Sequence, residues 1–334
     1  MQRLKLSYRV ETHRLAAPFR ISGYVFETSD VVVAELEDGE FTGRGEAAGV
    51  YYLGDDSAHI VSELETHREA IETCWDREQL RSLMPKGGAR NAVDCALWDL
   101  EAKRDGSDAL KIAKIEAARP LVTTFTLGAD EPKVMAEGAR RYADAQAIKV
   151  KLTGELALDI ERVAAIRGAR PDVWLGVDAN QGFTRGDLDP LVDALSTHRV
   201  SLLEQPIKRG NEAELEGYRC PIPIAADESA LGLDDVPSLL GRFDVINIKL
   251  DKCGGLTEAL LIAEEARRIG LGVMVGNMVG TSLAMAPAFV VGQHCDVVDL
   301  DGPTFLTEDR KPSCEYHRGT IFCSPDVWGS RLAA

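Results

Sequence analysis

Three acidic residues of this 334-residue chain each end a short apolar run, and the runs follow one another along the sequence. They are Asp178, Glu204 and Asp227, separated by 26 and 23 residues. On neighbouring strands of one parallel sheet, about 4.8 Å apart, their carboxylates would meet at one edge. This all-oxygen set favours a hard cation, Mg²⁺ or alternatively Mn²⁺. The other interpretation is salt bridges with nearby lysines, but three clustered carboxylates without a cation would repel one another.

Three lysines accompany these acids. Lys149 and Lys151 are two residues apart in the apolar run 147–152, so they point to the same side of a strand. Lys249 lies at the end of a later run, 245–250. We expect Lys151 and Lys249 to be bases on opposite sides of one substrate carbon, one removing a proton and the other returning it. Lys149 is expected to bind substrate. The alternative is that the lysines are solvated residues on the rim of the fold.

A D-x-D pair near the end of the chain places the carboxylates of Asp299 and Asp301 on one face of a strand. Two acids beside a substrate that is held by its own carboxylate favour an ammonium group, and thus a zwitterion. Thr126, which lies near the end of the first run, is expected to bind substrate with them. The alternative is that both acids pair with Lys or Arg.

Eight apolar runs must position these residues, and their landmark residues recur every 22 to 28 positions. A strand, a helix and two short loops need about that length. The sequence therefore predicts an α/β fold with a (β/α)8-type barrel, whose chemistry lies at the C-terminal strand ends. The runs are 122–127, 147–152, 173–178, 200–205, 223–227, 245–250, 272–276 and 296–301.

The first part of the chain has a different pattern. Alternating residues on both sides of Asp38-Gly39 predict a hairpin, and residues at helical spacing follow. We expect an α+β capping domain over residues 1–117, joined by the tail 304–334, and the barrel over 118–303. The strand-like segment within 319–328 is expected to return to the N-terminal unit.

The bulk composition excludes several classes. A net charge of −16 argues against nucleic acid and anionic membrane as partners, and no apolar stretch reaches the roughly 18 residues of a membrane span. Seven cysteines, an odd number without a CxxC pair, predict reduced thiols in a cytoplasmic protein and neither a disulfide framework nor a zinc site.

Five motifs that contain these residues resemble the enolase superfamily, muconate-lactonising subgroup. The resemblance implies a modified (β/α)7β barrel with a capping domain, Mg²⁺ as the cofactor and a lysine base. A homo-oligomer is also expected. The motifs are KVK (149–151), VDANQ (177–181), LEQP (203–206), ADES (226–229) and NIKLDKCGG (247–255).

Within that subgroup, the D-x-D pair and VGTSLAMAPA (279–288) are most like the dipeptide epimerases of the L-Ala-D/L-Glu type. The resemblance implies an isomerase that removes and returns the α-proton of the C-terminal residue of a dipeptide through a metal-stabilised enediolate. The alternatives are an N-acylamino acid racemase, a cycloisomerase and a non-catalytic ligand-binding barrel.

The resemblance implies that side-chain preference comes from loops of the capping domain, here near residues 19–27 and 50–57. Relatives that act on Ala-Glu often carry an Arg in the first of these loops, and this chain has Arg20. Asp55 and Asp56 would disfavour an acidic side chain if they point inward.

Overall fold

The computed structural model describes residues 3–21 and 23–330, and its central element is a sheet of eight parallel strands. The strands follow one another in chain order, which is the order of a barrel. This confirms the predicted architecture, because each of the eight apolar runs forms one strand. The strands are β5 (Thr124–Leu127), β6 (Ala147–Lys151), β7 (Trp174–Asp178), β8 (Leu202–Glu204), β9 (Ile224–Ala226), β10 (Val245–Ile248), β11 (Gly272–Val275) and β12 (Val297–Val298).

Side chains join the first barrel strand to the last. The backbone N–H of Leu300 donates to Oγ1 of Thr123 over 2.9 Å, and the N–H of Thr126 donates to Oδ2 of Asp301 over 2.6 Å. The barrel is therefore nearly closed, and polar residues of the predicted site form part of the seam.

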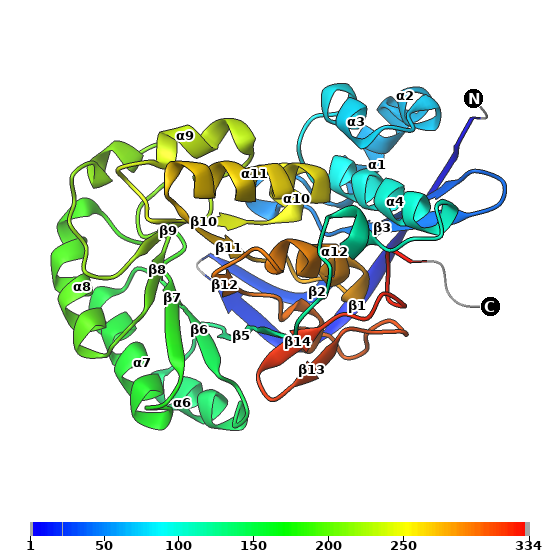
Figure 1. The fold of residues 1–334 in the computed structure, drawn as a ribbon. Helices are drawn as coiled ribbons and strands as arrows, with labels where there is room; N and C mark the ends of the chain where they lie inside the picture. Colours follow the sequence, from blue (N-terminus) through cyan, green and yellow to red (C-terminus); the bar gives the residue numbers. More distant parts are fainter. Residues whose placement is uncertain (1–2, 22, 331–334) are drawn as a thin grey trace.

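Helices cover the outside of the barrel, and Figure 1 shows α6, α7 and α8 outside the green strands. Alternation along each strand accounts for this packing. In β10, Ile246 and Ile248 belong to the main apolar core, whereas Val245 belongs to a small cluster with Leu202, Ala225 and Met274 of three other strands. The helices are α6 (Pro132–Arg141), α7 (Leu156–Ala169), α8 (Leu188–Thr197), α9 (Val236–Leu239), α10 (Leu250–Cys253), α11 (Leu256–Ile269) and α12 (Ser282–Gly292).

The N-terminal part forms a three-stranded antiparallel sheet packed against helices, as the sequence predicts. The hairpin at Asp38 is also confirmed, because its carboxylate accepts hydrogen bonds from the N–H groups of Glu40 and Phe41. The elements are β1 (Lys5–Ile21), β2 (Tyr24–Glu37), β3 (Thr42–Ala47), α1 (Ser57–Thr66), α2 (Arg68–Thr73), α3 (Arg77–Leu83), α4 (Gly88–Arg104) and α5 (Ala109–Ile112).

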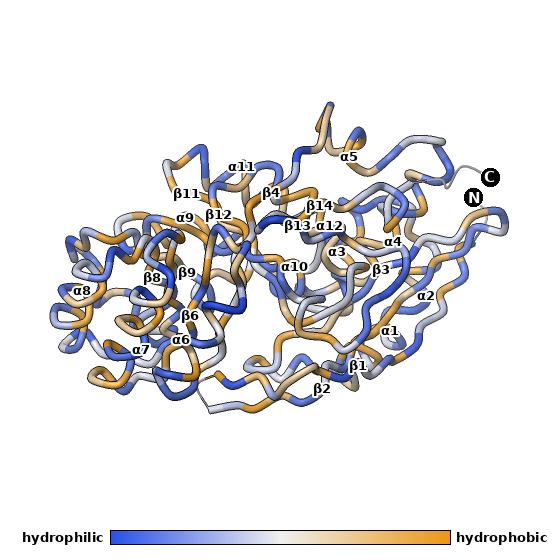
Figure 2. Tube along the Cα trace, turned by 90° about the horizontal axis from the view of Figure 1, so that it is seen from below, coloured by the Kyte–Doolittle hydropathy of each residue, from blue (hydrophilic) through white to orange (hydrophobic). Residues whose placement is uncertain are grey.

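Strands β1 and β2 form a long hairpin that extends from the N-terminal sheet to the barrel (Figure 2). Its far end is tied to loops at the C-terminal ends of the barrel strands. The N–H of Ala129 donates to the carbonyl of Arg20, Oγ of Ser29 donates to the carbonyl of Val279, and the rings of Phe19 and Phe305 are 4.8 Å apart. The hairpin therefore covers the barrel mouth.

Two glycines allow α10 and α4 to approach closely. Gly254 and Gly255 have φ angles of 79° and 118°, which favour glycine. A Cβ on Gly254 would lie 2.3 Å from Nε of Arg90, and one on Gly255 would lie 2.5 Å from Cβ of Asp94. This contact fixes the segment directly after Lys249.

The C-terminal tail corrects two predictions. Its strands β13 (Glu315–His317) and β14 (Thr320–Phe322) form a hairpin in which β14 pairs with β4 (Leu121–Val122), not with the N-terminal sheet. The tail contacts the N-terminal unit before and after this hairpin: Nε of Arg310 donates to Glu46, and Nε1 of Trp328 donates to the carbonyl of Arg44 in β3. The predicted return to the N-terminal unit is therefore confirmed for the end of the segment, although its strand pairs with β4.

Cys314 and Cys323 form a disulfide, so the prediction of reduced thiols is wrong for this pair. The hairpin explains their proximity, because they directly flank the paired residues Glu315 and Phe322. A nine-residue spacing gives no such signal in the sequence.

In the part of the chain that the structure describes, no helix is long and apolar enough to cross a membrane.

Candidate active site

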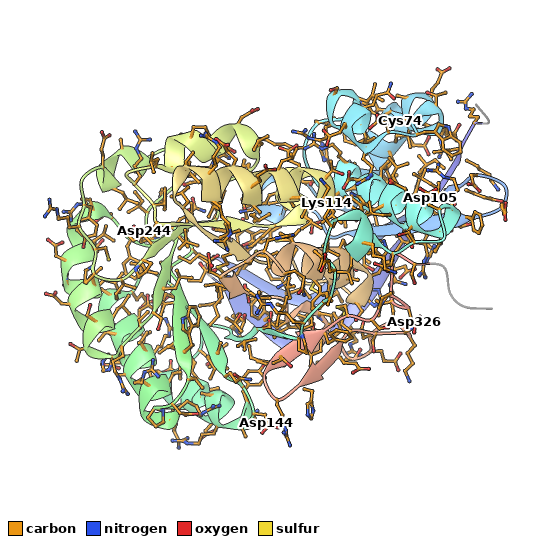
Figure 3. The ribbon with its side chains drawn as sticks, in the orientation of Figure 1. Cys74, Asp105, Lys114, Asp144, Asp244 and Asp326 are labelled. Carbon is orange, nitrogen blue, oxygen red and sulfur yellow. A yellow bond between two sulfur atoms is a disulfide. The ribbon has the colours of Figure 1, made fainter. Side chains whose placement is uncertain are left out.

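Five consecutive strands of the barrel carry charged residues at their C-terminal ends. Lys151, Asp178 and Glu204 end β6, β7 and β8 and are paired in register, Lys151 with Asp178 and Asp178 with Glu204. Asp227 and Lys249 directly follow β9 and β10. Figure 3 labels Asp244, which precedes β10 and so marks the opposite end of that strand from Lys249. The order Lys-Asp-Glu-Asp-Lys is symmetric about β8.

The three acids at the centre of this row form one cluster. Asp178, Glu204 and Asp227 are buried, and each offers an oxygen within 4.8 Å of the others. Burial raises the pKa of Asp178 and Asp227, but nearby lysines outweigh it and both pKa values are lowered. Burial, followed by the charge of Asp178, raises the pKa of Glu204 to about 7. The nearby lysines therefore do not fully neutralise the negative charge of the cluster, which a bound cation would stabilise.

The lysines of the row donate to these acids. Nζ of Lys151 lies 2.6 Å from Oδ2 of Asp178, and Nζ of Lys249 lies 2.7 Å from Oδ2 of Asp227. Burial disfavours the charged form of Lys249, but Asp227 outweighs burial and the pKa of the lysine is raised. Both amines are therefore held at the rim of the carboxylate cluster, on opposite sides of it.

Sequence reasoning missed a further lysine. The side chain of Lys252 is fully buried, and its Nζ donates to the carbonyl and Oδ1 of Asp227, each over 2.6 Å, and to the carbonyl of Asn247 over 3.0 Å. Burial lowers its pKa. The available signal was its place within NIKLDKCGG, one helical turn after Lys249.

Residues next to the acids hold them in place. Oε1 of Gln205 accepts hydrogen bonds from the N–H groups of Asp227 and Ser229, and the N–H of Asn180 donates to Oδ1 of Asp178. Asn180 and Gln205 have φ angles of 43° and 37°, in the left-handed region. Strained backbone of this kind is typical of functional sites.

Three buried oxygens around the cluster have no hydrogen-bond partner among the residues that the structure describes. They are Oδ1 of Asn180, Oε2 of Glu228 and Oδ1 of Asn247. Asn180 and Glu228 follow cluster ligands in the sequence, and Asn247 donates through Nδ2 to Glu204 over 2.8 Å. Buried oxygens without partners suit the water molecules that Mg²⁺ retains when carboxylates bind it. The donor set therefore fits this ion.

The D-x-D pair lies beside the same row, on the seam of the barrel. Oδ2 of Asp299 accepts from Nζ of Lys149 over 2.8 Å, and Asp301 accepts from the N–H of Thr126. Lys149 also lies 2.8 Å from Glu204, so it links the pair to the carboxylate cluster. Burial, followed by the charge of Asp299, raises the pKa of Asp301 to about 7. Asp299 thus has a lysine partner, whereas Asp301 is bonded to backbone.

A cavity of about 170 Å³ lies between the barrel mouth and the N-terminal unit. Lys151, Asp227 and Lys249 line its floor, and Phe26 and Tyr51 belong to its other wall. A smaller cavity of about 50 Å³ adjoins it, contains both lysines and is lined by Thr126, Lys149, Asp299 and Asp301. All the predicted site residues except Asp178 and Glu204 line one of these two cavities. Asp178 forms an ion pair with Lys151 and Glu204 forms one with Lys149, so both acids lie next to lining residues.

The two segments expected to be specificity loops are ordered elements. The first is the end of the β1–β2 hairpin, apart from residue 22, which lies outside the described residues, and the second contains the 3-10 helix η1 (Tyr51–Leu53). Asp55 accepts from the N–H of Gly88, and Asp56 accepts from the N–H of His59. These two acids therefore cap helices and do not point into the cavity.

Two family models match the chain. One, described as mandelate racemase / muconate lactonizing enzyme, N-terminal domain, covers residues 5–111, and the other, described as enolase C-terminal domain-like, covers residues 134–321. The L-Ala-D/L-Glu epimerase of Escherichia coli K12 is 37% identical over 93% of this chain and 97% of its own length. An N-acetyl-D-glutamate racemase from a Pseudoalteromonas species is 38% identical over 87% of this chain and 92% of its own.

Solved structures show the same likeness. An enolase family member from Agrobacterium tumefaciens with homology to dipeptide epimerases, bound to sodium and L-Ala-L-Glu, has a TM-score of 0.93 and 38% identity over 98% of this chain and 100% of that one. The dipeptide epimerase of Enterococcus faecalis V583, complexed with Mg and L-Leu-L-Tyr, has a TM-score of 0.92 and 28% identity over 99% of each chain. Together with the strand-end motifs, these matches confirm the resemblance, and the chain belongs to the mandelate racemase / muconate lactonizing enzyme group of the enolase superfamily.

Proposed function

We propose that the protein is a Mg²⁺-dependent dipeptide epimerase that inverts the α-carbon of the C-terminal residue. The observation that carries this proposal is the symmetric row at the strand ends, in which Lys151 and Lys249 flank one cluster of carboxylates. A binding protein has no need for two amines aimed at one place from opposite sides. The relatives named epimerases support the same reaction class.

Asp178, Glu204 and Asp227 would hold the ion. When bound, Mg²⁺ would supply positive charge that acidifies the α-proton of a carboxylate substrate and favours the neutral form of a nearby lysine. Lys252 and Gln205 keep Asp227 in place from the side away from the cavity.

The two lysines would divide the proton transfer. Neutral Lys151 takes the α-proton from one face of the substrate carbon, while Lys249 as an ammonium gives a proton to the other face, and the roles reverse for the opposite isomer. The substrate carboxylate would lie toward Asp178, Glu204 and Asp227, where the charge of a bound cation would offset the repulsion between the acids. Its ammonium group would reach Asp301, which accepts the N–H of Thr126 through Oδ2.

The experiment is a screen of L,L-dipeptides with the Mg²⁺-loaded protein in D₂O, read by mass. Epimerisation replaces the α-proton of the C-terminal residue by deuterium, so we expect a gain of one mass unit together with the L,D-isomer. If no dipeptide gains deuterium, the proposal is wrong.

A racemase of N-acylamino acids is the second candidate, and two observations favour it. The Pseudoalteromonas relative acts, by its name, on N-acetyl-D-glutamate, and Asp299 is already neutralised by Lys149. N-acetyl amino acids belong in the same screen. Faster exchange in them than in free dipeptides would establish this candidate in place of the first.

A further inference from the structure

The wall of the main cavity that faces the lysines is built from aromatic rings. Phe26 lies 5.3 Å from Tyr51 and Tyr51 lies 5.2 Å from Tyr52, measured between ring centroids. Tyr24 extends the cluster from outside, stacked on Phe26 at 6.0 Å. Such rings bury large apolar surface and prefer aromatic or aliphatic contacts.

Strand alternation directs the apolar residues of the hairpin inward. Phe19, Ile21 and Phe26 line the cavity, whereas their neighbours Arg20 and Val25 do not. The Arg20 side chain, 52% exposed, lines a separate groove and lies 4.0 Å from Asp130. Val25 is 59% exposed. The arginine that the sequence offered for binding an acidic side chain therefore does not line the main cavity.

The cavity has no spare positive charge. Among the described residues that line it, the only basic ones are Lys151 and Lys249, and each is paired with an acid of the cluster. Asp30 lies on the wall and adds a further carboxylate, which accepts from Oγ1 of Thr12. A substrate carboxylate placed against this wall would lose water without gaining a counter-charge, which is costly.

One polar group on the wall could still meet a substrate. The hydroxyl of Tyr52 is buried and has no hydrogen-bond partner among the described residues. Burial raises the pKa of this hydroxyl, and the charges of Asp227 and Glu228 raise it further. A neutral hydroxyl offers a carboxylate one hydrogen bond and no counter-charge, so it does not make the wall suitable for an acidic side chain.

The position of the wall relative to the lysines identifies the group that it contacts. The main cavity holds both lysines and the aromatic wall, whereas the smaller cavity holds the same lysines and the D-x-D pair. A dipeptide whose amine reaches Asp301 therefore directs the side chain of the inverted carbon toward Phe26 and Tyr51.

Resting on the proposed epimerase function, we infer that the residue inverted by this enzyme carries a large uncharged apolar side chain, aromatic or branched aliphatic, and not glutamate. Phe26 is the residue on which this selectivity depends most, because it packs on the ring of Tyr51 and lines the cavity, whereas Tyr24, which also packs on Tyr51, does not line it.

The test compares four substrates, L-Ala-L-Phe, L-Ala-L-Leu, L-Ala-L-Glu and L-Ala-L-Lys, by initial rates of deuterium uptake with the Mg²⁺-loaded protein. We expect kcat/KM for the Phe and Leu dipeptides to exceed that for the Glu dipeptide by about ten-fold or more, since a pocket discriminates strongly against a group that it leaves unpaired. A Glu or Lys dipeptide that is turned over as well as the Phe dipeptide overturns the inference.

A pair of adjacent substitutions localises the effect. Phe26→Arg places a cation on the inner face and should raise the Glu/Phe ratio of kcat/KM by about ten-fold or more. Val25→Arg adds the same charge to the outer face of the same strand and should leave that ratio unchanged. Equal ratios in both variants contradict the inference, and if Phe26→Arg does not fold, the wild-type series decides alone.

The failure of this inference can be told from the failure of the proposed function. If no dipeptide takes up deuterium, the proposed function fails. In that case N-acetyl-L-Phe and N-acetyl-L-Glu probe the same wall, and faster exchange of N-acetyl-L-Glu overturns the side-chain assignment as well.

Discussion

Lys151 and Lys249 hold equivalent positions on the two sides of Glu204. Each extends from a strand two places away from β8, and each donates to an aspartate on the intervening strand, Lys151 to Asp178 and Lys249 to Asp227. The strand order of the barrel alone produces this symmetry. In the proposed reaction, it would give one reacting carbon a base on each face.

Loss of the metal site should abolish turnover. Asp227→Asn removes one carboxylate of the cluster and leaves Lys249 and Lys252 without their shared counter-charge. We expect kcat/KM to fall by far more than ten-fold, and EDTA followed by dialysis to remove the activity of the wild type until Mg²⁺ is added back. Asp189→Asn, a change of a 71% exposed surface acid, is the matched control. Full activity after dialysis against EDTA would rule out the metal assignment.

The proposed role of Asp301 in binding the substrate amine can be tested without disturbing the seam of the barrel. In Asp301→Asn, the amide oxygen can still accept from the N–H of Thr126. We expect kcat/KM for dipeptides to fall about ten-fold or more, because a charge-assisted hydrogen bond is lost. N-acetylated dipeptides carry no ammonium group, so the substitution should change their much lower rates little. An equal loss for both kinds of substrate would mean that Asp301 acts only through the structure.

Stability should depend on pH through the contact of Asp251 with the N-terminal unit. Its carboxylate accepts from the N–H groups of Ala48 and Gly49, and burial, with a further contribution from the charge of Asp55, raises its pKa to about 7. The folded protein therefore holds this proton more tightly than the unfolded chain does. The resulting stabilisation is present at low pH and is lost as pH rises through about 7.

Asp251→Asn removes this titration and keeps an acceptor oxygen. The free energy of unfolding of the wild type, minus that of the variant, should fall between pH 5 and 7 by up to about 1.4 kcal/mol per pH unit and then level off. Urea denaturation at pH 5, 6, 7 and 8 measures it. A difference that stays constant over this range contradicts the assignment.

The barrel was predictable from the sequence because one periodicity fixes both its strands and its chemistry. Strand ends in a parallel barrel meet at one place, so the residue types at those ends predict the cluster of Asp178, Glu204 and Asp227. Motif order also indicated the family. The oligomeric state and the cytoplasmic location stay predictions.

What the sequence could not provide depends on contacts between distant segments. The alternation of β1 predicts that Phe19 and Arg20 face opposite ways, but only the docking of the hairpin decides which of them meets the cavity. Similarly, the sequence does not show whether Asp55 and Asp56 point into the cavity. In the structure, they accept hydrogen bonds from N–H groups in the first turns of α4 and α1. Lys252 was missed because a lysine in a helix is normally solvated.

Removal of each lysine in turn tests the central claim most directly. Lys151→Ala and Lys249→Ala, with the exposed Lys5→Ala as the control, are incubated in D₂O with each pure diastereomer of the best dipeptide, and the α-proton and the isomer ratio are followed by proton NMR. We predict that both variants lose at least about a hundred-fold of their epimerisation rate. Each variant should still exchange the α-proton of one diastereomer, and the two should exchange opposite ones, while Lys5→Ala behaves as wild type. If either site variant interconverts both diastereomers at the wild-type rate, the two-base account is wrong.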